Sequence, residues 1–200
     1  MIIDWGVSER AFAGAAHSGD QYLVEPFPQG VLVVVVDGLG HGPEAFVAAH
    51  RATEVAAQHA GEPVDDILRR CHDALKGTRG AVMSVAALRS DEGRMAWLGV
   101  GNVEGALFRT TPGGIRAERQ ALLPRPGVVG YRISALHVAV LPIVPGDTVI
   151  FATDGIASAF LEDPPLHLSP QQLADDTLVR FGRATDDALA LALCYRGAAP

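Results

Sequence analysis

The first half of the chain predicts strands followed by a pair of helices. A β-branched run at residues 31–36 predicts a buried strand that ends at a sharp turn, Asp37-Gly38. Beyond this turn, small residues recur at helical spacing from Pro43, a residue that suits the first position of a helix. A second apolar stripe predicts another helix at 64–75. Shorter strands are expected at 2–8 and 21–27.

The second half changes to the alternation that is typical of hairpins. Strands are predicted at 81–89, 94–101, 103–109, 115–119, 136–141 and 147–153, with turns at 90–93 and 111–114 and a loop at 122–131. A helix is expected to begin after Asp154-Gly155. Another is expected at 170–181 with Ser169 as its N-cap, before a closing strand at 188–195.

This order of elements predicts an α+β fold. The helices come in two pairs separated by hairpins, which differs from the βαβα alternation of a doubly wound sheet. We therefore expect antiparallel sheets in layers, covered by helices on the outside. With 200 residues, 48% of them hydrophobic and 20% charged, the chain fits a single domain at 1–200.

Charge and composition argue against some classes of binding partner. The net charge of −7 comes without a cluster of Lys or Arg, which argues against nucleic acids and anionic membranes as partners. The longest apolar run has six residues, 31–36, and no signal peptide is expected at the N-terminus. Cys71 and Cys194 lack CxxC spacing, so we interpret them as buried thiols in a reducing, cytoplasmic environment.

Aspartates stand where predicted strands begin or end. Asp37 and Asp154 each follow an apolar strand and precede a glycine, Asp20 precedes a strand, and Asp186 and Asp187 precede the last one. Any single Asp-Gly could be an ordinary turn, but together these carboxylates can converge at one rim of a sheet. Oxygen ligands without His or Cys favour a hard cation such as Mg²⁺ or Mn²⁺.

The ordered set of motifs resembles a known family. The motifs are Gly19-Asp20, Asp37-Gly38-Leu39-Gly40-His41-Gly42, Gly99-Val100-Gly101-Asn102, Ala152-Thr153-Asp154-Gly155-Ile156 and Thr185-Asp186-Asp187. They are similar to those of PPM-type serine/threonine phosphatases (the protein phosphatase 2C superfamily), in their bacterial SpoIIE branch. Because the chain shows no sensor or coiled-coil extension, it most resembles the RsbX-type phosphatases, which act on scaffold and regulator proteins of the stressosome.

The resemblance implies an αββα sandwich that holds two divalent cations, Mn²⁺ or Mg²⁺, at one end. By motif position Asp37 would bridge both ions and the Gly38 carbonyl would bind one. Asp154 and Asp186 would hold the other ion, and Asp20 would act mainly through water. The expected catalytic centre is Asp37 with Asp154, where water activated by the cations attacks phosphorus in line without a phosphoenzyme.

Some positions depart from the family pattern. Eukaryotic members carry a phosphate-binding Arg before the first acidic motif, whereas residues 11–18 contain none, and Leu39 replaces a His proposed as an acid. His41 could substitute for that His, although we prefer a loop or hydrogen-bonding role. Asp187 and His41 are thus candidates for a metal ligand or for support behind the ligands. Phosphate binding and protonation of the leaving group have no assigned residue.

The resemblance also implies a partner. We expect a phosphoserine or phosphothreonine on a small regulatory protein, such as a STAS-type scaffold or an anti-sigma-factor antagonist, and a monomer or weak dimer. A first alternative is a catalytically weak module that keeps the fold to bind a signalling partner. A second is a nucleotide-binding protein, suggested by the glycines of 38–42, but these lack the Lys-Ser/Thr of a P-loop.

Overall fold

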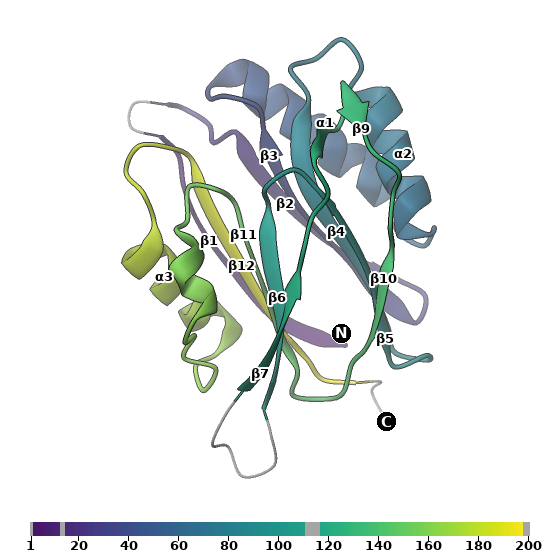
Figure 1. The fold of residues 1–200 in the computed structure, drawn as a ribbon, viewed down its shortest axis with the longest axis vertical. Coiled ribbons are helices and arrows are strands. Elements are labelled where there is room, and N and C mark those ends of the chain that lie inside the picture. The colour runs from purple at the N-terminus through teal and green to yellow at the C-terminus, as the bar shows by residue number, and fades with distance from the viewer. Residues whose placement is uncertain (1, 13–14, 111–116, 198–200) are drawn as a thin grey trace.

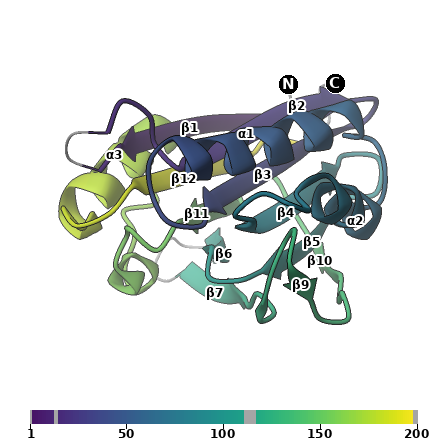
Figure 2. The same cartoon turned by 90° about the horizontal axis from the view of Figure 1, so that it is seen from above.

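Two five-stranded antiparallel sheets stack face to face in the computed structural model, which describes residues 2–12, 15–110 and 117–197 (Figure 1). Helices cover the outer face of each sheet, which gives four layers (Figures 1 and 2). The described part of the chain thus has the predicted α+β architecture of two antiparallel sheets between helices. None of its helices combines the length and the apolar character needed to cross a bilayer.

The first sheet has the strand order β10-β5-β4-β3-β2. Its strands are β2 (Asp20–Phe27), β3 (Gly30–Gly38), β4 (Ala81–Arg89), β5 (Arg94–Val100) and β10 (Ala139–Pro142). Helices α1 (Pro43–Gln58) and α2 (Val64–Ala74) pack on its outer face. Strand β3 is covered on both sides: Val33 and Val35 face the other sheet, and Val34 and Val36 face the helices. This double burial explains its unbroken apolar run.

The second sheet has the strand order β1-β12-β11-β6-β7. Its strands are β1 (Ile3–Arg10), β6 (Glu104–Thr110), β7 (Ala117–Leu122), β11 (Thr148–Ala152) and β12 (Ala188–Tyr195). Helix α3 (Pro170–Phe181) covers its outer face. Ser169 caps α3 by accepting a hydrogen bond from the Gln172 amide within a capping box, which confirms the predicted N-cap.

Small side chains bring α1 close to the first sheet. Ala48, Ala49, Ala52 and Ala56 are fully buried in one apolar cluster with residues of β3 and β4. Larger side chains at these positions would hold the helix farther from the strands. The predicted small-residue face of this helix is therefore confirmed, and it brings the start of α1 next to the end of β3.

Four local predictions are wrong. The segment after Asp154-Gly155 forms only a short 3-10 helix, η1 (Ser158–Leu161), instead of an α-helix. Pro164 and Pro165 follow closely and cannot continue a helix, so α3 has no full helical partner on its sheet. Asp37 and Gly38 are still paired within β3 and do not form a turn. The loop at 122–131 includes β8 (Gly127–Val128), which pairs with β9 (Arg132–Ile133), and the strand predicted at 136–141 begins only at Ala139.

The cysteines match their prediction in part. Both thiols are free; Cys71 is fully buried, and burial raises its pKa to about 12. Cys194, near the end of β12, is partly exposed, so the prediction of a buried thiol is wrong at this position. The predicted turn at 111–114 lies outside the described residues.

Candidate metal centre

The chain segments that carry the five aspartates meet at one end of the sandwich, the upper end in Figure 1. Asp37, near the end of β3, pairs directly with Asp20, the first residue of β2. Asp154 follows β11, while Asp186 and Asp187 precede β12, and these two strands are neighbours in the other sheet. The predicted convergence at one rim is therefore found, with aspartates from both sheets.

Thr153 joins the two sheets at this end. Its Oγ1 donates a hydrogen bond of 2.7 Å to Asp20 Oδ2 and accepts one of 2.9 Å from the Leu189 amide. Asp20 is only 2% exposed, and Thr153 is equally buried. A hydroxyl from the second sheet thereby fixes the orientation of a carboxylate from the first.

The neighbouring residues Asp186 and Asp187 have different environments. Asp187 is 3% exposed, and its two carboxylate oxygens accept hydrogen bonds from the Phe12 amide (2.7 Å) and the Gly19 amide (2.9 Å). Asp187 therefore holds the connection between β1 and β2. Asp186 is partly exposed, and one of its oxygens accepts the Asp187 amide at 2.9 Å. Of the two, Asp186 has more freedom to bind a ligand.

Burial and mutual repulsion raise the pKa values of three aspartates in the cluster. Burial is the main cause that raises the pKa of Asp37 to about 8, and the charges of Asp20, Asp154, Asp186 and Asp187 raise it further. Burial likewise raises the pKa of Asp20 to about 7 against the opposing hydrogen bond from Thr153. The pKa of Asp186 is raised too, first by burial. Within the described residues, none of the five carboxylates forms an ion pair with Lys, Arg or His.

The donor set fits a hard divalent cation that keeps part of its water shell. In the described residues no three His, Cys, Asp or Glu side chains are arranged so that they could hold an ion by themselves. Mg²⁺ is usually bound by one or two carboxylates together with waters and phosphate oxygens, so it needs no such closed cage. Carboxylates from both sheets supply the charge, and within the described ranges no Lys or Arg forms an ion pair with them.

A glycine is required beside Asp37 for steric reasons. A Cβ atom on Gly38 would lie 2.1 Å from the carbonyl oxygen of Ala45, in the first turn of α1. The Gly38 amide donates a 3.0 Å hydrogen bond to the Gly19 carbonyl. Gly38 thus lets the end of β3, the start of α1 and the residue before Asp20 approach one another.

Two further polar residues support the cluster and were not predicted from the sequence. Asn102 Nδ2 donates a 2.8 Å hydrogen bond to Asp154 Oδ2. Thr153 orients Asp20 as described above. Asn102 belonged to a noted motif, and its place directly after a strand, like that of Asp154, was the signal that could have identified it.

His41 lies at the edge of the cluster. Its side chain is exposed, its ring centroid is 5.4 Å from that of Phe12, and its charge lowers the pKa of Asp186. The Phe12 amide in turn bonds Asp187, so His41 lies at the border of the acidic cluster.

The fold and the motifs agree with comparisons to known proteins. The family described as stage II sporulation protein E (SpoIIE) matches residues 28–196. The chain is 27% identical over 143 residues to the phosphoserine phosphatase RsbX of Bacillus subtilis strain 168, which covers 72% of this chain and 69% of that protein.

Two solved structures share the whole architecture. A structure reported as the bacterial stressosome, a modular system adapted to control secondary messenger signaling, matches with a TM-score of 0.84 and 28% identity over 96% of this chain and 98% of that chain. A crystal structure of RsbX in complex with magnesium matches with a TM-score of 0.84 and 21% identity, over 96% of this chain and 95% of that chain.

Proposed function

The chain belongs to the SpoIIE family, within the protein phosphatase 2C superfamily, and from this premise we propose that it is a metal-dependent phosphoprotein phosphatase acting on phosphoserine or phosphothreonine. The observation that carries the proposal is the cluster of five aspartates from both sheets that no described Lys or Arg neutralises. A cluster of this kind destabilises the fold unless cations occupy it, which favours a metal site over an ordinary surface.

The proposed ligand set follows the motif positions of the family. Asp37 would be shared by two divalent cations, Mn²⁺ or Mg²⁺, and the Gly38 carbonyl would hold one of them. Asp154 and Asp186 would hold the other, and Asp20 would act mainly through water. When bound, such cations lower the pKa of water and neutralise the oxygens of a phosphoryl group.

The other residues of the chain orient this centre. Asn102 fixes the carboxylate of Asp154, and Thr153 fixes that of Asp20. Asp187 holds the β1–β2 connection through two backbone amides, which keeps Gly19 and Asp20 in place. Because these contacts are made within the protein itself, they orient the carboxylates for a cation or a phosphate.

The proposed substrate is a phosphorylated regulatory protein of bacterial stress signalling, such as a STAS-type scaffold or an anti-sigma-factor antagonist. The support is the similarity to the phosphoserine phosphatase RsbX and to a stressosome structure. We further propose that residues 1–200 act as one domain. A module that only binds a partner would have no need to keep unpaired acidic residues, so we prefer the enzyme.

Phosphate release from phosphoserine, phosphothreonine and phosphotyrosine peptides, with Mn²⁺, with Mg²⁺ and after chelation, tests this function. We expect metal-dependent release from the first two peptides. Asp37→Asn should lose nearly all activity with an unchanged far-UV circular dichroism spectrum, because both ions lose a shared ligand. Asp73→Asn, the same change on exposed α2, is the matched control and should stay active. Full activity after chelation, or in Asp37→Asn, would remove the metal-centre proposal.

A further inference from the structure

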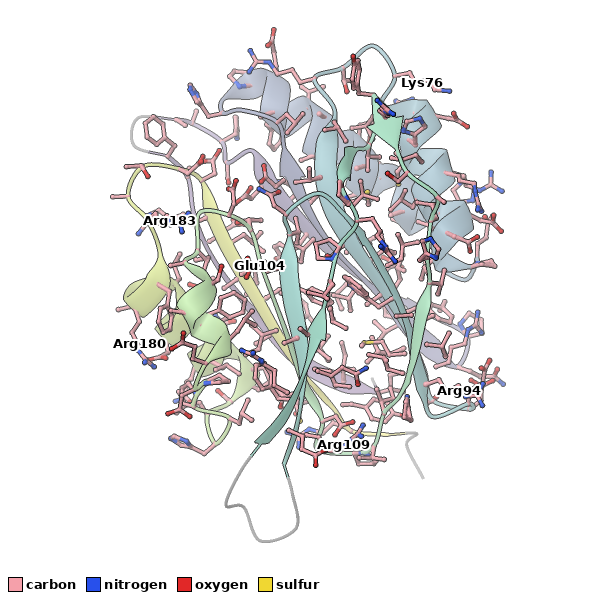
Figure 3. The ribbon with its side chains drawn as sticks, viewed as in Figure 1. Lys76, Arg94, Glu104, Arg109, Arg180 and Arg183 are labelled. Atoms are coloured by element: carbon pink, nitrogen blue, oxygen red, sulfur yellow. The ribbon has the colours of Figure 1, made fainter. Side chains whose placement is uncertain are left out.

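Arg183 is fixed against the turn that carries Asp154. It lies in the connection between α3 and β12, on the same side of the molecule as Arg180 but nearer the upper end (Figure 3). Its amide donates a 2.7 Å hydrogen bond to the Gly155 carbonyl, and its Nη1 donates one of 3.0 Å to the Asp154 carbonyl. Its own carbonyl accepts a 2.5 Å hydrogen bond from Arg10 Nη2. Backbone and guanidinium are therefore both held beside the site.

The guanidinium of Arg183 keeps donors available. Its side chain is exposed, and within the described residues no carboxylate forms an ion pair with it. A guanidinium has five N–H donors, of which the Asp154 carbonyl takes one. The contact goes to the backbone of Asp154, so Arg183 occupies neither oxygen of the Asp154 carboxylate.

Two other arginines near this end are engaged elsewhere. Arg79, whose Nη1 lies close to Gly40, pairs with Glu44 at the start of α1. Arg10 is directed to the Arg183 carbonyl. Arg183, in contrast, combines a fixed position next to the aspartates with unused donors.

We propose that Arg183 binds the phosphoryl oxygens of the substrate, and that Arg10 positions it. This inference rests on the proposed phosphatase function and fills the role for which the sequence offered no residue at 11–18. An approaching phosphate dianion is repelled by the aspartates, and a planar guanidinium offers paired donors that match phosphate oxygens. The hydrogen bonds to the Asp154 and Gly155 carbonyls fix the position of the guanidinium relative to the proposed metal ligands.

Binding of inorganic phosphate to the Mg²⁺-saturated protein, measured by calorimetry, tests the inference together with kcat and KM for a phosphoserine peptide. The variants are Arg183→Ala, Arg183→Lys and Arg180→Ala. Arg180 is the matched control, since it pairs with Asp176 on α3 and lies over the Phe181 ring. We expect Arg183→Ala to weaken phosphate binding and to raise KM by roughly tenfold each, the loss of one charge-assisted hydrogen bond.

Arg183→Lys should be intermediate, because an ammonium keeps the charge but cannot serve both the Asp154 carbonyl and a phosphate in one plane. Arg180→Ala should match wild type. The Mg²⁺-induced rise in melting temperature should be the same in all variants, since Arg183 leaves the metal ligands unchanged.

Wild-type phosphate affinity and KM in Arg183→Ala would overturn the inference while leaving the phosphatase proposal intact. A lost Mg²⁺-induced shift in this variant would also overturn it, because Arg183 would then act by holding Asp154. If wild type hydrolysed nothing but bound phosphate through Arg183, only the phosphatase proposal would fail. If wild type bound no phosphate, both would fail.

Discussion

Asp186 and Asp187 directly precede β12 and are neighbours in sequence, yet their carboxylates have different roles. Asp187 points into the protein and accepts two backbone amides from the β1–β2 connection. Asp186 is partly exposed and faces the shared acidic cluster. A buried amide that loses its acceptor destabilises the folded protein whether or not a metal is bound. A ligand carboxylate, in contrast, matters when the cation is present.

Asp187→Ala should therefore destabilise the protein even without metal. It leaves the Phe12 and Gly19 amides without their acceptor, and we expect a loss of about 2 kcal/mol, or a melting temperature lower by about 4–8 °C. Asp187→Asn retains one acceptor oxygen and should lose less. Asp186→Ala serves as the comparison: melted with chelator it should resemble wild type, and with Mn²⁺ it should show a smaller upward shift. If Asp186→Ala melted lower than Asp187→Ala without metal, Asp186 and not Asp187 would be the carboxylate that stabilises the fold.

At this scale the sequence predicts positions better than contacts. Asp37 and Asp154 could be identified because each ends an apolar run and precedes a glycine. The supporting roles of Thr153, Asn102 and Arg183 could not, because their partners depend on how two sheets stack. The bond from Thr153 to Asp20 spans 133 positions, and that from Asn102 to Asp154 spans 52.

Among the elements, α3 approaches the second sheet at a strand position that has no side chain. A Cβ atom on Gly6, in β1, would lie 2.3 Å from the Cα atom of Gln171. Gln171 in turn bonds both backbone groups of Val7: its Nε2 donates to the carbonyl at 2.8 Å and its Oε1 accepts the amide at 3.3 Å. The first turn of α3 thus packs directly against the backbone of β1.

Gly6→Ala should lower stability, because backbone atoms of α3 would have to move away from β1. Overpacking of a close contact typically costs about 1–3 kcal/mol, so we expect a melting temperature lower by about 2–12 °C. Gly61→Ala is the matched control, since its nearest neighbour would be 4.0 Å away, and it should melt within about 1–2 °C of wild type. Equal melting temperatures for the two variants would show that α3 can shift without loss.

Most of the element order was predicted correctly, because period and turn residues are local properties. The failures have both tertiary and local causes. Asp37 and Gly38 resemble a turn in sequence, yet Val82 and Ala81 in β4 extend the ladder to them. The helix expected after Gly155 was limited to η1, since the sequence to Pro165 leaves room for little more.

Across the whole molecule, the acidic cluster couples folding to protons and cations. In the folded state the pKa values of Asp37 and Asp20 are about 8 and about 7, against 3.8 for an ordinary aspartate. At a pH between the ordinary and the raised pKa, the folded protein keeps protons on these carboxylates that the unfolded chain has released. Stability of the metal-free protein must then fall as pH rises through this window.

We accordingly expect the melting temperature, measured with chelator, to decrease between about pH 5 and pH 8. Asp37→Asn removes one of the two titrations and should make this decrease shallower. Added Mg²⁺ requires ionised carboxylates, so its stabilising effect should grow with pH over the same range. A metal-free wild type whose melting temperature does not fall toward pH 8, or falls no more steeply than that of Asp37→Asn, would contradict the raised pKa values.

The place of β12 in its sheet determines when the site can come into existence during synthesis. β12 lies between β1 and β11, so β1 has no strand partner in this sheet until residues 188–195 have been made. The first sheet needs nothing beyond Pro142, and it can assemble with α1 and α2 on the nascent chain. Pairings between distant segments form slowly. In the order of synthesis, Asp20 and Asp37 can therefore be aligned with each other before Asp154 and Asp186 join them to complete the acidic cluster.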